Sequence, residues 1–283
     1  MKLLEETYIR FLLCNDILGK PVLSADEFNV FKKTFYNENV RHIVINDLSD
    51  IKERTGNKKR AEKIYNAINT KDERGLEKLE QSGYKVLAKD DSDYPQKLIE
   101  KLGDNAPILL YTLGNSSLLN RLSTAVTGSR RISEKCKSFA DDIGKIITEE
   151  KKTLISGGAT GADYIATKSA LTNGGCAVWF SCLPYTAYNA DEISLWLQSG
   201  RFCICWDYNP FAEFSGKNAL RRNKYIYANS EESFVCQCNS IQSGTYSGAS
   251  NCLKHRLSKV YVFNDGSEAA NELMKLGAIE IIK

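Results

Sequence analysis

Three glycine-rich segments in this sequence each follow a short apolar run and precede an amphipathic one. Glycine lets the main chain pass close to a ligand and adopt left-handed dihedral angles, so several backbone N–H groups can point at one anion. The start of a following helix adds about half a positive charge. The sequence therefore predicts a phosphate-binding site made of Gly128, Ser129 and Arg130 in the first segment, Ser156, Gly157, Gly158, Thr160, Gly161 and Asp163 in the second, and Ser243, Gly244, Thr245 and Gly248 in the third.

The three segments do not match the common nucleotide-binding fingerprints. None carries the Gly-Lys-Ser/Thr of a Walker A loop. None gives a full Gly-x-Gly-x-x-Gly with a ribose-binding acid further on, which argues against NAD-type binding. A single glycine-rich turn is common for steric reasons alone, whereas three at one edge of a sheet favour an anion or nucleotide site.

A basic segment between the second and third motifs places four cations within eight residues, with aromatic residues on both sides. Cations can follow the phosphates of a nucleic-acid strand while aromatic rings stack on its bases. The alternative is a solvated helix start whose tyrosines pack inward. Because the segment follows an apolar run, as the glycine-rich segments do, we favour a role in DNA binding for Lys217, Arg221, Arg222, Asn223 and Lys224.

Few residues are suited to covalent or metal chemistry. Asp163 is the only carboxylate near the glycine-rich segments that we would name as a general base. His42 and His255 have no obvious partner groups, so a Ser/His or Cys/His mechanism has little support. The pairs Cys203/Cys205 and Cys236/Cys238 lack the spacing of structural zinc sites and are expected to pack in the core. We expect no metal, no cofactor, and a binding protein rather than an enzyme.

Strands and helices alternate from residue 84 onward, which is typical of a mostly parallel sheet with helices on both faces. Such a sheet binds ligands beyond the carboxyl ends of its strands, where the glycine-rich segments fall. The expected strands are 84–88, 108–112, 123–127, 153–156, 177–182, 202–206, 233–238, 259–263 and 279–282, and the expected helices are 133–149, 162–171, 191–198, 219–228, 247–255 and 268–276. The predicted fold class is α/β and Rossmann-like.

The first 80 residues carry helical patterns instead. Apolar positions predict helices over 3–13, 24–35 and 58–68, the second opened by a capping box of Ser24 and Glu27. The turn at 55–57, before a basic helix, is similar to half of a helix-hairpin-helix element that receives DNA phosphate; an ordinary helix–helix turn is the favoured interpretation. We expect a small helical domain over 1–80 and a Rossmann-like domain over 81–283.

Composition sets outer limits on function. The 283 residues are 42% hydrophobic and 26% charged, the balance of a globular protein. The formal charge of +3 is too small to argue for nucleic acid by itself. No signal-peptide or membrane-spanning run is evident, and nine cysteines without a secretory signal suggest reduced thiols. The expected location is the cytoplasm, without membrane contact.

The order and spacing of the motifs resemble the DprA/Smf family of DNA-processing proteins, within the wider SLOG superfamily of nucleotide-binding proteins. The resemblance covers about residues 82–263 and rests on Asp93-Tyr94-Pro95, Ala106–Tyr111 and Gly114-Asn115, then Gly128-Ser129-Arg130, Ser156–Asp163 with Ala170-Leu171 and Gly174-Gly175, Arg222-Asn223, and Ser243-Gly244-Thr245. The helical first 80 residues also look like the family's small N-terminal domain, of SAM or helix-hairpin-helix type.

This resemblance implies an extended Rossmann fold that binds single-stranded DNA and helps to load a recombinase during recombination or DNA uptake. The residues that it would place at the site are Gly128, Ser129, Arg130, Gly157, Gly161, Asp163, Arg222 and Asn223. Asp163 could instead orient its loop, and Asn223 could cap a turn. An Ile-, Val- and Tyr-rich C-terminal edge would suit a homodimer.

The sequence departs from the family pattern at several points. Thr160 stands where the family usually carries an arginine, and Thr167 where it often has a histidine. The late motif at 243–249 is closer to SLOG proteins that bind small nucleotides, and no winged helix is expected after the sheet. The alternative function is therefore a nucleotide-binding sensor, or a hydrolase or transferase acting on a small nucleotide derivative, for example in phage defence.

Overall fold

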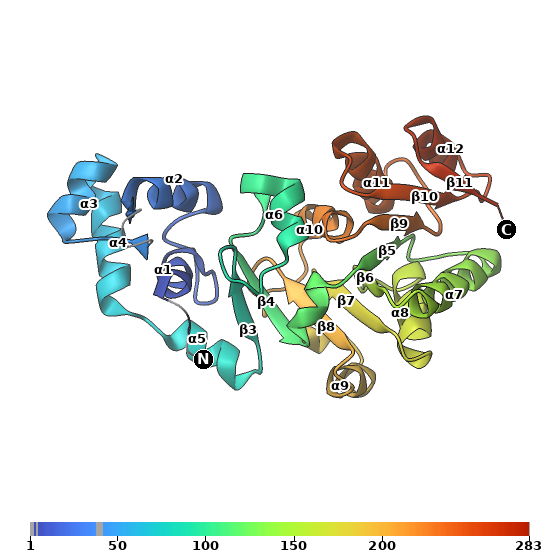
Figure 1. The fold of residues 1–283 in the computed structure, drawn as a ribbon, viewed down its shortest axis with the longest axis horizontal. Coiled ribbons are helices and arrows are strands. Elements are labelled where there is room, and N and C mark those ends of the chain that lie inside the picture. The colour runs from blue at the N-terminus through green and yellow to red at the C-terminus, as the bar shows by residue number, and fades with distance from the viewer. Residues whose placement is uncertain (1–2, 4, 38–41, 283) are drawn as a thin grey trace. The chain divides into compact units, whose positions relative to one another are not determined.

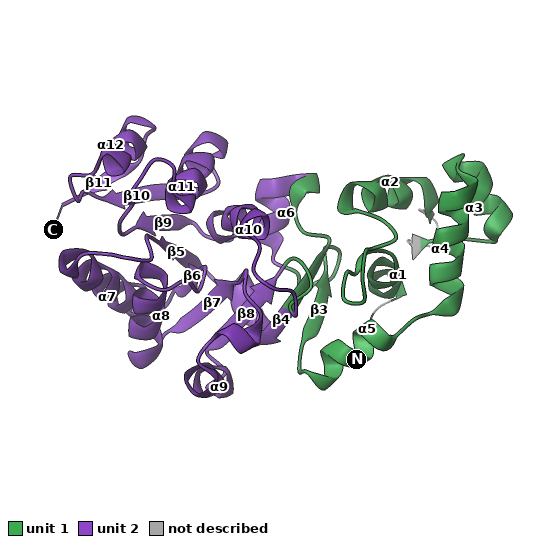
Figure 2. Cartoon of the chain, turned by 180° about the vertical axis from the view of Figure 1, so that it is seen from behind, with its two compact units in different colours: residues 1–94, 104–111, 207–210 green, residues 95–103, 112–206, 211–283 purple. Residues whose placement is uncertain are grey.

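The computed structural model describes residues 3, 5–37 and 42–282. The chain forms two compact units, which Figure 2 shows in green and purple. Unit 1 comprises Met1–Tyr94, Asp104–Tyr111 and Asp207–Pro210, and unit 2 comprises Pro95–Gly103, Thr112–Trp206 and Phe211–Lys283.

Unit 1 is mainly helical. Its elements are α1 (Glu5–Cys14), α2 (Ala25–Phe35), β1 (Tyr36–Asn37), β2 (His42–Ile43), α3 (Leu48–Thr55), α4 (Lys58–Thr70), α5 (Arg74–Gln81) and β3 (Lys85–Ala88). The predicted helices α1, α2 and α4 are present, as is the capping box of Ser24 and Glu27. Helices α3 and α5 were not predicted. The turn between α3 and α4 uses Gly56 at φ 62° and the side chain of Asn57 as the N-cap of α4, which fits an ordinary helix–helix turn.

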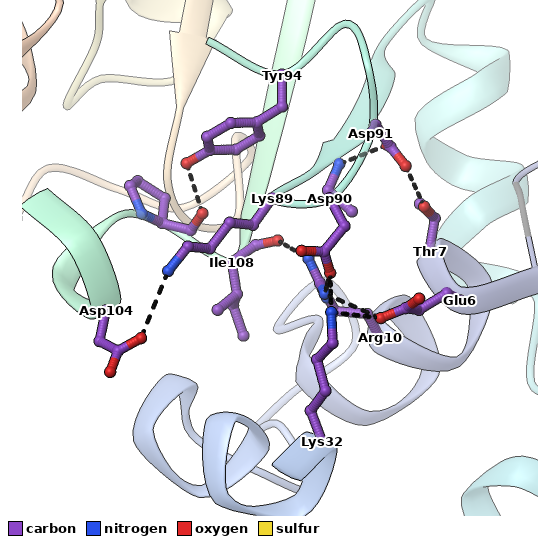
Figure 3. Close-up of polar contacts among 12 residues, drawn as sticks. Glu6, Thr7, Arg10, Lys32, Lys89, Asp90, Asp91, Tyr94, Asp104 and Ile108 are labelled. Atoms are coloured by element: carbon purple, nitrogen blue, oxygen red, sulfur yellow. Dashed lines mark hydrogen bonds and ion pairs between the residues drawn. The ribbon is translucent and has the colours of Figure 1, made fainter. Parts of the chain in front are cut away.

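A cluster of charged side chains joins α1 and α2 to the turn after β3 (Figure 3). Arg10 is 2% exposed, pairs with Asp90, and lies 3.6 Å from the Glu6 carboxylate. The Lys32 ammonium lies 2.7 Å from Glu6 and 2.5 Å from Asp90. Burial alone would raise the pKa of Asp90, but Arg10 and Lys32 together hold that pKa below its usual value. These ion pairs connect α1 and α2 to the turn that follows β3.

Unit 2 is an α/β structure (Figure 1). Its helices are α6 (Gln96–Leu102), α7 (Glu134–Glu149), α8 (Ala162–Thr172), α9 (Ala190–Gln198), α10 (Gly216–Ala228), α11 (Gly244–His255) and α12 (Glu268–Lys275). Its strands are β5 (Ser123–Thr127), β6 (Thr153–Ser156), β7 (Cys176–Phe180), β8 (Phe202–Trp206), β9 (Glu232–Val235), β10 (Lys259–Phe263) and β11 (Ile279–Ile281). The strand β4 (Leu109–Gly114) begins in unit 1 and ends in unit 2.

The seven strands of unit 2 run in the order β11-β10-β9-β5-β6-β7-β8 and all pair in parallel. Helices α7 and α8 cover one face, and α10, α11 and α12 cover the other (Figure 1). From β5 the chain builds outward through β6, β7 and β8, then returns to add β9 on the other side of β5. A doubly wound sheet binds ligands where this order reverses, outside the carboxyl ends of the strands. In this sheet that point lies between β5 and β9.

The structure confirms the predicted α/β class and corrects several element ends. Strand β9 stops at Val235 instead of residue 238, while α10 and α11 begin three residues earlier than predicted. Glycine at the first position of each of these two helices hid their true starts, because glycine has low helix propensity. The four cysteines of the two Cys-x-Cys pairs are buried. Among the described helices, none is both long and apolar enough to cross a bilayer.

Candidate phosphate-binding site

A cavity of about 470 Å³ lies in unit 2 at the reversal point between β5 and β9. The loop after β5 forms one wall with Gly128, Ser129, Arg130 and Arg131, and the loop before α11 forms another with Asn239, Ser243, Gly244 and Thr245. The remaining walls come from α10 with Arg222 and Asn223, and from Ala159 and Asp163 beyond β6. The three glycine-rich segments therefore do converge on one hollow, as the position of parallel strand ends predicts.

Hydrogen bonds fasten the first loop to the third. The Ser129 amide donates to the Gln237 carbonyl at 2.9 Å, and the Asn239 amide donates to Ser129 Oγ at 3.1 Å. The Asn239 side-chain amide donates to the Arg131 carbonyl at 2.9 Å. The Gln237 side chain in turn accepts from the amide of Ser133, the N-cap of α7. The rim of the cavity is thus held in place before any ligand arrives.

Glycine is needed where the first loop meets the second. A Cβ added to Gly128 would lie 2.5 Å from the Cβ of Ala162, well inside van der Waals contact. Gly161 has φ 88°, and a Cβ there would lie 2.4 Å from the Ser129 carbonyl oxygen. These two glycines therefore serve the close approach of the loops.

Asp163 organises the second loop from within the protein. Its carboxylate, 5% exposed, accepts from the Gly157 amide at 3.2 Å and the Ala159 amide at 3.4 Å. Burial raises the pKa of Asp163 to about 6, against the opposing effects of Arg222 and the backbone amides. Asp163 also lines the cavity. One side chain therefore both holds the second loop in place and borders the candidate site, the two roles considered for it from the sequence.

Arg222 is the central cation of the site. It is 6% exposed, and its Nη2 donates to the Cys182 sulfur at 3.3 Å. Its Nε is buried and has no acceptor among the described residues. A buried guanidinium N–H without a partner is costly and calls for an explanation. Arg222 lines the cavity, so an anion bound there would place a counter-charge beside this buried guanidinium.

Arg222 also borders a second cavity of about 250 Å³, which the second loop helps to line. Gly157, Gly158 and Thr160 line this smaller cavity, together with Cys182, Tyr188 and Phe214. The Arg130 guanidinium, which lines both cavities, lies 5.9 Å from the centre of the half-exposed Phe214 ring. The two cavities therefore share Arg130 and Arg222.

Some predicted site residues lie away from both cavities. Ser156 is fully buried, and its hydroxyl donates to the Val126 carbonyl at 2.7 Å. Gly248 packs α11 against the Tyr227 ring of α10. Lys217, Arg221 and Lys224 are on α10 but line neither hollow. Asn223 lines the larger one and donates to the Gly244 carbonyl at 3.1 Å, which ties α10 to the third loop.

Other lining residues were missed by the sequence analysis. Tyr227 lines the larger cavity, and its hydroxyl lies 3.0 Å from that of Thr127 at the end of β5. Cys182, Tyr188 and Phe214 line the smaller one. Cys182 could have been found, because it follows β7 at the same sheet edge as the glycine-rich loops. Among the described residues, no cluster of three or more His, Cys, Asp or Glu side chains could hold a metal ion.

Comparison with known proteins finds a matching family and several relatives. The sequence model of the family described as DNA recombination-mediator protein A matches residues 85–283. The DNA processing protein DprA of Mycobacterium tuberculosis is 25% identical over 191 residues, covering 62% of this chain and 47% of that protein. The chain thus spans about half the length of the curated relatives it matches. DprA of Streptococcus pneumoniae is 40% identical over 87 residues, which are 30% of this chain and 29% of that protein.

Two solved structures share the fold. The X-ray structure of DprA from S. pneumoniae gives a TM-score of 0.72 at 22% identity and covers 99% of this chain and 95% of that one. A structure of DprA from Helicobacter pylori, described for its single-stranded DNA binding mode, gives a TM-score of 0.59 at 26% identity. It covers 70% of this chain and 90% of that one. Because the family model spans most of the sequence, this chain belongs to the DNA recombination-mediator protein A family.

Proposed function

We propose that unit 2 binds single-stranded DNA, with a backbone phosphate in the cavity beside Arg222. The observation that carries the proposal is the nearly buried Arg222 cation that lines the cavity where the glycine-rich loops meet. Its Nε has no acceptor among the described residues. The single-stranded DNA binding of the H. pylori relative supports the same ligand class. The proposal covers binding alone and involves no bond-making step.

The charges and rings around the cavity suit a strand rather than a duplex. Arg130 and Arg131 are exposed at the rim, where they can neutralise phosphates on either side of the one held by Arg222. The Phe214 ring is 50% exposed and lies beside Arg130. An unstacked base can lie on such a ring while the guanidinium holds its phosphate. These contacts read the DNA backbone and ring faces, so we expect little sequence preference.

Fluorescence anisotropy with a labelled oligothymidylate tests this. The double variant Arg130→Ala/Arg131→Ala should weaken binding by about tenfold or more and lower the slope of log affinity against log salt by about 1.4, or 0.7 for each lost phosphate contact. Arg121→Ala is the matched control, since Arg121 is also exposed in unit 2 but lines neither cavity. Equal slopes for the double variant and the control would refute DNA binding at this rim.

A small nucleotide is the second candidate ligand. The larger cavity, at about 470 Å³, lies within the range of small-molecule sites. Thr160 contributes a neutral hydroxyl to the smaller one. Thermal-shift screening with mono-, di- and cyclic nucleotides, each repeated against excess oligothymidylate, separates the two functions. Stabilisation by a nucleotide that the oligonucleotide does not displace favours the nucleotide function; DNA-only stabilisation favours the first proposal.

Membership of a recombination-mediator family leads us to propose a recombinase as protein partner, a cytoplasmic location, and a homodimer. The dimer proposal rests on exposed apolar side chains at the C-terminal edge, where Leu276, Ile279 and Ile282 are 52%, 41% and 77% exposed. Sedimentation velocity should show a dimer that Ile279→Glu converts to a monomer. A monomer at all concentrations for the unaltered chain would contradict it.

A further inference from the structure

Unit 1 contains a groove of about 510 Å³ that the DNA-binding proposal does not use. It lies between the loop that follows α1, residues 15–22, and helix α4. Its apolar surface comes from Leu12, Leu18, Val22 and Ala67. Its polar rim comes from Lys20, Lys63, Asn66 and Thr70.

The loop wall of the groove is preformed. The amide of Leu23 donates to the Leu13 carbonyl at 2.8 Å and closes the base of the loop. Within it, Asn15 Nδ2 donates to the Phe11 carbonyl at 2.6 Å, and the Ile17 amide donates to Asn15 Oδ1 at 3.3 Å. Ile17 is 5% exposed and anchors the loop in the core. A partner that entered the groove would therefore not have to order this wall.

The groove carries a net positive charge. Lys20 and Lys63 are exposed and form no ion pair with any described residue. Asp72 is the single carboxylate among the described lining residues, and Arg74 already holds it through hydrogen bonds of 2.8 and 2.6 Å. These bonds help to lower the pKa of Asp72 to about 2. An incoming ligand therefore meets two uncompensated ammonium groups.

The groove also offers apolar contact and free hydrogen-bonding groups. Leu18 is 51% exposed at its edge. The backbone of Leu18, Gly19 and Lys20 makes no hydrogen bond with another described residue, and the Asn66 side chain is likewise unpaired within the described chain. These groups can pair with the main chain of an extended peptide.

We propose that this groove binds a short segment of a partner protein in which aliphatic side chains alternate with Asp or Glu. The aliphatic residues would cover Leu18 and Val22, and the carboxylates would face Lys20 and Lys63. A nucleic-acid strand fits less well, because the described lining residues include no aromatic ring on which a base could stack. This inference goes beyond DNA binding and does not depend on it.

The test uses the full chain and a fluorescent array of ten-residue peptides that alternate Leu or Val with Asp or Glu, beside an array with Lys in place of the acids. Acidic peptides should bind, and Lys20→Glu/Lys63→Glu should weaken the tightest of them by about tenfold or more, in a salt-dependent manner. Leu18→Ser should weaken it too. Lys85→Glu, a change at an exposed lysine outside the groove, should leave binding within about twofold.

Three outcomes would overturn the proposal. The first is an acidic array that binds no better than the basic one. The second is an equal loss of binding for Lys85→Glu and for the groove variant. The third concerns competition with oligothymidylate. If oligothymidylate displaces the bound peptide from the unaltered chain but not from Arg130→Ala/Arg131→Ala, the peptide binds at the DNA site instead of the groove.

Discussion

The guanidinium of Arg222 rests directly on the backbone at Gly157. A Cβ added to Gly157 would lie 1.7 Å from Nη1 of Arg222 and 2.7 Å from its Cζ. No side chain fits between them, and both residues line the smaller of the two cavities. The Asp163 carboxylate accepts a hydrogen bond from the Gly157 amide on the same loop, and the positive charge of Arg222 acts to lower the pKa of Asp163.

Gly157→Ala should therefore displace the Arg222 guanidinium and weaken binding of oligothymidylate by about tenfold, the effect of losing one charge-assisted contact worth about 1.4 kcal/mol or more. Anisotropy measures the affinity, and thermal unfolding shows whether the fold survives. Gly216→Ala is the control, because a Cβ there meets no atom within 4 Å. A folded Gly157→Ala protein that binds as well as the control would show that Arg222 does not contact the ligand.

Asp163 should make stability depend on pH in a defined direction. An unfolded aspartate titrates near 3.9, whereas the pKa of Asp163 in the folded chain is raised to about 6. The folded state thus holds the proton more tightly, so this stabilising contribution is complete below pH 4 and is lost as the pH rises through 6.

The comparison variant is Asp163→Asn, which cannot titrate. Urea unfolding should show the free energy of unfolding of the unaltered chain rising relative to Asp163→Asn by about 2–3 kcal/mol between pH 7 and pH 4. If the difference in unfolding free energy between the unaltered chain and Asp163→Asn stays constant over this range, or shrinks on acidification, the Asp163 pKa is not raised.

Arg222 and Asp163 should also be coupled energetically. Arg222→Met alone leaves a buried carboxylate without its cation and should cost about 3–5 kcal/mol at pH 7.5. Adding Asp163→Asn removes that charge, so the double variant should be more stable than Arg222→Met. A double-mutant cycle measured by urea unfolding gives the coupling directly, and strictly additive effects would contradict the pairing.

Much of unit 2 could be predicted because buried parallel strands form continuous apolar runs and their helices carry a regular apolar stripe. The order of those strands could not, since pairing β9 with β5 joins residues about a hundred positions apart and leaves no local signal. The sequence thus locates the glycine-rich loops at strand ends without showing that the first and third are neighbours. Ser156 illustrates a further limit: its hydroxyl turns inward to the Val126 carbonyl, a side-chain direction that the motif does not encode.

In unit 1 the missed helices have weak local patterns. Helix α3 has only Leu48 and Ile51 as apolar positions, and α5 contains Gly75, which lowers helix propensity. Gly75 is buried in unit 1, and an added Cβ would lie 3.5 Å from both Ile17 and Phe11, an ordinary van der Waals distance. Whether α3 and α5 form helices is therefore determined by tertiary contacts and not by their local sequence pattern.

The charged cluster of unit 1 yields a last prediction (Figure 3). Arg10 is 2% exposed, and it pairs with Asp90 and Glu6 and lies 5.1 Å from the centre of the Phe28 ring. Arg10→Ala removes a buried cation, but Lys32 still pairs with Asp90 and Glu6, so the change should cost about 1.5–3 kcal/mol, the range for hydrogen bonds to charged groups. The matched exposed pair is Arg74 with Asp72, where Arg74→Ala should change stability much less than Arg10→Ala does.

Acid should reduce the difference between Arg10→Ala and the unaltered chain. Because the pKa of Asp90 is held below its usual value, its stabilising contribution is present above the unfolded pKa near 3.9 and is lost as the pH falls through the lower, folded value. The cost of Arg10→Ala, measured by urea unfolding, should therefore be largest near pH 7 and decline below pH 4. A cost that is independent of pH would assign the effect to packing against Phe28 rather than to the ion pair.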